Sequence, residues 1–128
     1  MPIKRSVAAL LAAVMAANGL AMLFAGPWWY GVVPGVTATG PFNAHFIKDI
    51  GAAFLMAGVG LGWFAWRPAS GRPTALMAAG FLVAHALIHV ADAAGGHHPG
   101  HDVLRDLAGV YLPAVLSAWI AWPNSRST

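Results

Sequence analysis

The feature that most constrains this chain is a set of four long apolar runs, joined by one short turn over residues 67–73 and two longer connections. The runs cover about residues 7–25, 45–66, 74–93 and 103–122, and each has roughly the 20 apolar residues that a membrane-spanning helix needs. With 59% hydrophobic and 9% charged residues, the chain of 128 residues is too apolar for a soluble domain. We therefore expect an all-α, polytopic membrane protein with a single transmembrane domain over residues 1–128.

Cations and tryptophans indicate how the helices cross the membrane. One end carries Lys4, Arg5, Arg67, Arg72 and Arg126. By the positive-inside rule, this places the N- and C-termini in the cytoplasm and predicts a multi-pass protein of the bacterial inner membrane. The lipid bilayer is then the first partner, and cations scattered over segment ends do not indicate a nucleic-acid partner.

The connections between the runs contain few charged residues. The stretch 26–41 is uncharged and rich in Gly and Pro, so we expect a packed cap rather than a helix. A short turn over 67–73 makes the second and third helices antiparallel neighbours.

All six histidines and all four acidic residues lie at the other end of the runs. The chain has no Cys, which excludes disulfides, thiolate metal sites and iron–sulfur clusters. A charge in the bilayer core costs at least about 2.5–3.5 kcal/mol, so such residues normally face the bundle interior and are functional. This end is therefore where we expect the functional site, near the periplasmic face.

The spacing of these polar residues favours a metal centre. His85, His89 and Asp92 recur at i, i+4 and i+7 on one helix face, and His45 and Asp49 are also four residues apart. Imidazole and carboxylate ligands without thiolate suit a transition metal such as zinc, copper or iron. The expected ligands are Asp49, His85, His89 and Asp106, with His45 and Asp92 as further ligands or orienting groups, and with Lys48 and Arg105 balancing the charge.

A second histidine-rich segment lies in the turn before the fourth run. It contains His97, His98, His101 and Asp102 among glycines and a proline. Short tracts of this kind can capture metal, although an exposed turn with no ligand is the alternative interpretation. If it binds metal, we expect it to recruit an ion rather than to hold one in place.

An internal repeat relates the second and fourth runs. Residues 47–55 (IKDIGAAFL) match residues 104–112 (LRDLAGVYL) in the order aliphatic, cation, Asp, aliphatic, small, two spacers, aromatic, Leu. A fainter match pairs residues 18–22 with 85–89, so Asn18 and Met22 take the positions of His85 and His89. The repeat predicts a four-helix transmembrane bundle built from two pseudo-repeated hairpins in the same orientation, as in transporters with parallel repeats.

The segment from Trp28 to Gly51, with the sequence PFNAHFIKDIG over residues 41–51, is similar to that of small bacterial membrane proteins. The layout of the whole chain resembles the broad DoxX-like group of four-helix membrane proteins. Some members of that group are linked to quinone-coupled oxidoreductases, so the resemblance implies an accessory role in redox chemistry.

Three classes of function follow from the sequence. The first is a protein with a His/Asp metal centre, acting as a metal-dependent redox or hydrolytic enzyme or in metal handling. The second is a haem-binding or quinone-linked electron-transfer subunit. The third is a metal-free scaffold or a proton-coupled transporter subunit that uses the same residues as a polar network. A small bundle also favours self-association or a larger membrane partner in each case.

Overall fold

The computed structural model describes residues 2–96 and 103–123, and every regular element within these ranges is helical. In chain order the elements are α1 (Pro2–Phe24), α2 (Gly26–Val32), the 3-10 helix η1 (Val36–Thr39), α3 (Ala44–Trp66), α4 (Pro68–Gly95), α5 (Val103–Asp106), the π-helical segment η2 (Leu107–Tyr111) and α6 (Leu112–Ala121). Among the described residues, four stretches are long and apolar enough to cross a membrane: α1, α3, α4 and the continuous run Val103–Ala121. The expected all-α fold with four candidate spans is confirmed.

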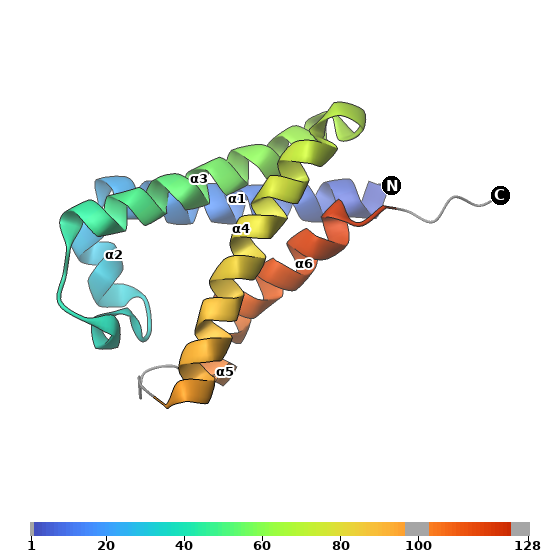
Figure 1. Ribbon diagram of the computed structural model, residues 1–128. Coiled ribbons are helices and arrows are strands. Elements are labelled where there is room, and N and C mark those ends of the chain that lie inside the picture. Colours follow the sequence, from blue (N-terminus) through green and yellow to red (C-terminus); the bar gives the residue numbers. More distant parts are fainter. Residues whose placement is uncertain (1, 97–102, 124–128) are drawn as a thin grey trace.

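The spans form two antiparallel pairs that cross at an angle (Figure 1). α1 packs mainly against α3, and α4 packs against both α3 and α6. Each pair is one of the predicted hairpins. The core lies where the pairs meet, and every span contributes a residue that is almost completely buried: Met15, Leu61, Leu82 and Ile120.

Glycines set the close approach of α1 to α3. A Cβ atom on Gly19 would lie 2.6 Å from the carbonyl oxygen of Gly51, and one on Gly58 would lie 2.8 Å from the backbone nitrogen of Ala16. Backbone atoms therefore occupy the space that a side chain would need. Small residues permit this packing between membrane helices, where apolar burial alone supplies little driving force. The small residues of the second span thus act within the bundle.

The segment after α1 is more regular than its composition suggested. We expected a packed cap without a helix over residues 26–41, and the structure has α2 and η1 there. Pro27 lies in the first turn of α2, where its fixed φ angle suits a helix and its missing N–H removes no helical bond. The Tyr30 hydroxyl donates a hydrogen bond to the carbonyl of Gly40. This bond connects the end of the cap to α2. Asn43 then caps α3 by accepting from the backbone N–H groups of His45 and Phe46.

The third span begins earlier than the predicted residue 74. α4 starts at Pro68, and only Arg67 separates it from α3. Two contacts explain the tight turn. A Cβ on Gly71 would lie 2.5 Å from the Cα of Phe64, so α3 and α4 nearly touch there. The Thr74 hydroxyl donates to the carbonyls of Gly60 at 2.9 Å and Gly71 at 2.7 Å.

The fourth span is irregular in its first half. The Leu112 N–H donates to the carbonyl of Leu107, which is the spacing of a π-helix. Pro113 follows immediately and has no N–H to continue an α-helical ladder. The π segment thus lies where the proline disturbs the helix, and it changes the direction of the residues before it relative to α6.

Four helix termini and their cations meet at one end of the molecule, where α1 begins and α6 ends (Figure 1). Lys4 Nζ donates to the carbonyl of Trp122 at 2.8 Å, and Arg5 Nε donates to that of Ala65 at 2.9 Å. Both carbonyls lie at helix C-termini, where cations are favoured. We call this the cation end. The opposite end, which carries α2, η1 and α5, is the histidine end.

Candidate functional site

The site centres on Asp106, at the junction of α5 and η2. Only 8% of its side chain is exposed, and both carboxylate oxygens are engaged. Oδ1 accepts a hydrogen bond from Arg105 Nε at 2.9 Å, and Oδ2 lies 2.9 Å from His89 Nδ1. We refer to His85, His89, Arg105 and Asp106 as the Asp106 cluster.

The bond between Arg105 and Asp106 is unusual because neighbouring residues in a regular α-helix point in different directions. Here the α-helix ends at Asp106 and the π segment begins at the next residue. The long, flexible Arg105 side chain reaches back to the carboxylate at this junction. The pair offsets an anion that would otherwise be costly among apolar helices. Arg105 thus pairs with Asp106, whereas Lys48, the other cation expected to balance charge, is exposed on α3.

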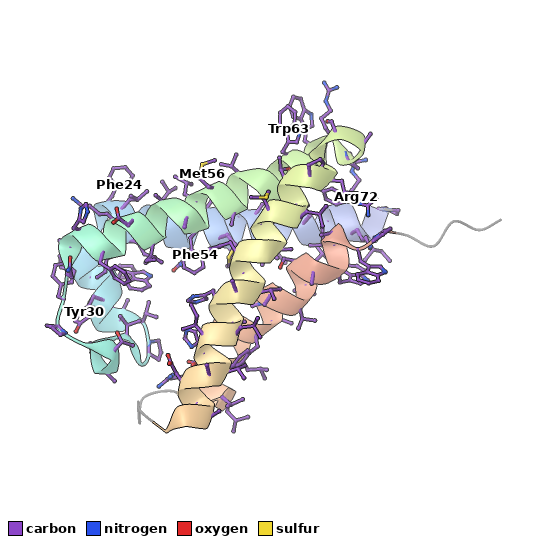
Figure 2. The ribbon with its side chains drawn as sticks, viewed as in Figure 1. Phe24, Tyr30, Phe54, Met56, Trp63 and Arg72 are labelled. Carbon is purple, nitrogen blue, oxygen red and sulfur yellow. The ribbon has the colours of Figure 1, made fainter. Side chains whose placement is uncertain are left out.

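The two histidines of α4 lie on one face, as their spacing predicted. Their ring centroids are 4.7 Å apart with planes at 68°, so the imidazoles are in edge contact. His85 also lies against Phe54 of α3 and stacks on Phe81, at centroid distances of 5.5 and 6.2 Å. Figure 2 shows Phe54 on the side of α3 that faces α4. One side of the cluster is therefore aromatic and apolar.

Arg105 also joins the cluster to the cap of the first hairpin. Gly35 precedes η1 with φ +84°, and a Cβ there would lie 2.5 Å from Cζ of Arg105. The guanidinium thus rests directly on the Gly35 backbone, which only glycine permits in this conformation. Nothing in the local sequence indicates this contact, because it joins residues 70 positions apart.

The expected six-residue ligand set is not assembled. His45 and Asp49 form a separate pair, 3.4 Å apart, with side chains 90% and 60% exposed. The reason is the orientation of α3, which buries Ile47 and Gly51. Asp49 lies two residues from each, or about 200° around the helix. His45 and Asp49 therefore do not join His89 and Asp106 in one centre, contrary to the expected ligand set.

The remaining candidate ligands have different placements. Asp92 is half-buried on α4, one turn beyond His89. His97, His98, His101 and Asp102 lie outside the described residues. Within residues 2–96 and 103–123, no group of three or more His or Asp side chains is arranged to hold a metal ion.

A second polar link lies in the first hairpin. Trp29 Nε1 donates to Asn18 Oδ1 at 2.8 Å, and Asn18 Nδ2 lies 3.7 Å from the sulfur of Met22. Asn18 and Met22 are the positions that the faint repeat matches to His85 and His89. Sequence reasoning missed the donor, Trp29, because tryptophans at span ends usually serve as interfacial anchors.

Comparison of the chain with protein-family models, curated proteins and solved structures found no match. The resemblance to DoxX-like proteins therefore stays a prediction, and the geometry of the Asp106 cluster is the basis for the functional argument.

Proposed function

We propose that the chain is an integral protein of a bacterial inner membrane, with its cation end in the cytoplasm and its histidine end at the periplasmic face. The four candidate spans support the membrane location. Lys4, Arg5, Arg67 and Arg72 support the orientation, since cations near short loops are retained on the cytoplasmic side. Exposed tryptophans at the cation end, Trp63, Trp66, Trp119 and Trp122, fit an interfacial position there.

We infer that the protein works as a membrane-embedded subunit without a metal of its own, and that the Asp106 cluster is the polar clamp that holds its histidine end together. The single observation that carries this inference is the double engagement of Asp106 by Arg105 and His89. A carboxylate already satisfied by a guanidinium and an imidazole needs no metal ion for charge compensation. Through Arg105 the clamp also reaches Gly35, so it links the second hairpin to the first.

A metal centre is the second candidate, and one observation favours it. In many metal sites, a histidine binds the ion through one ring nitrogen and donates a hydrogen bond from the other nitrogen to a carboxylate. His89 has this bond through Nδ1. Its remaining nitrogen, with His85 beside it, would then supply the ligands from α4. A haem flanked by these two residues does not fit, because imidazoles in mutual contact leave no room for a porphyrin between them.

Elemental analysis of protein purified without a His-tag separates the two candidates. The clamp predicts background metal, unchanged thermal stability after chelation, and clear destabilisation by His89→Ala. His45→Ala is the matched control, because His45 pairs with an aspartate four residues away in an exposed position. A near-stoichiometric ion that His89→Ala removes and His45→Ala leaves in place would overturn the clamp and establish the metal centre.

A further inference from the structure

An apolar groove runs between α4 and α6 on the outer surface, away from the Asp106 cluster. It has a volume of about 690 Å³. It is lined by larger apolar residues, Leu76, Val83 and Leu87, and by small residues such as Gly80, Ala84 and Ala118. A Cβ on Gly80 would have no neighbour within 4 Å, so the groove is open at its middle.

Among the described residues that line the groove, Arg72 alone is charged, and it lies at the cation end. Trp122 and Pro123 line the same end, and the carbonyl of Trp122 accepts a hydrogen bond from Lys4 Nζ. Lys4 is thus engaged beside the groove without lining it, so Arg72 is the cation that faces the groove, and the described lining contains no acidic residue to neutralise it. Figure 2 shows Arg72 near the end of the molecule at which α1 begins and α6 ends.

We propose that this groove binds an anionic phospholipid of the cytoplasmic leaflet, with the phosphate at Arg72 and one acyl chain along α4 and α6. Basic pockets between membrane helices on the cytoplasmic side recognise anionic headgroups in this way. From Arg72 to Leu87 the groove follows α4 for about 22 Å, at about 1.5 Å per residue. One leaflet contributes about half of the roughly 30 Å hydrocarbon core, so a whole chain fits along this tilted path.

The charge distribution favours a lipid over a second copy of the chain. In a symmetric dimer through this groove, Arg72 of both copies would approach one face with no described acidic side chain in the lining to pair with them. A lipid phosphate supplies that missing anion, and its chain supplies the apolar filling. This inference depends on the proposed membrane orientation but not on whether the Asp106 cluster is a clamp or a metal centre.

Native mass spectrometry of the full chain in detergent, titrated with phosphatidylglycerol or phosphatidylcholine of the same acyl chains, tests the proposal. The wild type is expected to bind phosphatidylglycerol about fivefold more tightly, the factor that one juxtamembrane cation contributes. Arg72→Gln should remove that preference. Arg67→Gln is the matched control and should keep it, because Arg67 lies over the ring of Trp66 and does not line the groove.

A second pair of variants tests the groove itself. Gly80→Phe fills it without a backbone clash and should lower retention of phosphatidylglycerol, whereas Gly109→Phe, which also has open space around its Cβ, should not. Equal binding of the two lipids by the wild type would overturn the proposal. Equal loss in Arg67→Gln and Arg72→Gln would also overturn it, as would a dimer that Gly80→Phe dissociates.

Discussion

The two copies of the cation–aspartate motif share a sequence pattern but have opposite surroundings. Asp49 in α3 is 60% exposed and pairs with an exposed histidine on its own helix, whereas Asp106 is 8% exposed and is bound by Arg105 and His89. The repeated motif therefore supplies the same residue types twice, but it does not determine whether its aspartate is buried or exposed. Only one copy forms part of a buried network.

The difference arises because the two helices bury opposite faces of the repeat. α3 buries Ile47 and Gly51, and the matching residues of the fourth span, Leu104 and Ala108, are exposed. The fourth span buries Asp106 instead. The buried face is shifted by two residues, or about 200° around the helix. The hairpins are thus equivalent in order and direction but not in the rotation of their second helices.

The largest expected effect comes from removing each aspartate. Asp106→Ala leaves a partly buried guanidinium and imidazole without their buried carboxylate, and loss of one partner of a buried ion pair costs about 3–5 kcal/mol. Asp49→Ala should change the free energy of unfolding by less than about 0.5 kcal/mol, because its pair is exposed. Unfolding by SDS titration measures both. Equal effects of the two substitutions would contradict the comparison.

The second-largest expected effect comes from enlarging the small residue of the repeated motif, which is Gly51 in α3 and Ala108 in the fourth span. Gly51→Leu places a side chain against α1. The new Cβ would lie 2.7 Å from the Cβ of Met22 and 3.0 Å from the carbonyl oxygen of Gly19. Overpacking of this kind costs about 1–3 kcal/mol. Ala108→Leu at the matching exposed position should be nearly neutral. If both variants unfold at the same SDS concentration as the wild type, α1 and α3 do not pack through these glycines.

The contact between the hairpins at Gly35 can be tested by a double-mutant cycle. Gly35→Ala puts a Cβ at φ +84° and displaces the Arg105 guanidinium, which we expect to cost about 1–2 kcal/mol. Part of that cost should disappear in an Arg105→Ala background, because the displaced group is gone. Strictly additive free energies of unfolding would show that the guanidinium does not rest on this turn.

The smallest expected effect lies in the first hairpin. There an uncharged hydrogen bond, from Trp29 to Asn18, takes the place of the ion pair of the second hairpin. Trp29→Phe removes the donor to Asn18 and keeps most of the aromatic surface. Loss of one neutral, partly buried hydrogen bond costs about 0.5–1.5 kcal/mol. Asn18→Ala in the same background should add little, because its main partner is already absent. A larger loss than in Asp106→Ala would reverse the ranking of the two hairpins.

Much of the fold could be predicted from the sequence, and less of the site. The four spans follow from apolar runs whose length matches a bilayer, and the cation end follows from where the cations fall in the chain. The contact of His85 with His89 follows from helical spacing. In contrast, the bond between Arg105 and Asp106 departs from the rule for adjacent helical residues, and helical spacing gave no reason to expect it. The helices of the cap were missed because Gly and Pro also begin helices.

The sequence by itself determined the all-helical class and the four candidate spans, and it places the histidines and aspartates near one end of those spans in the order of the chain. These properties depend on composition and spacing along a single helix. The tertiary structure decided which face of each helix is buried, and therefore that Asp106 joins His89 while Asp49 remains exposed. The physical reason is that helix rotation is set by packing between helices, such as the glycine contacts of α1 with α3, and not by periodicity within any one of them.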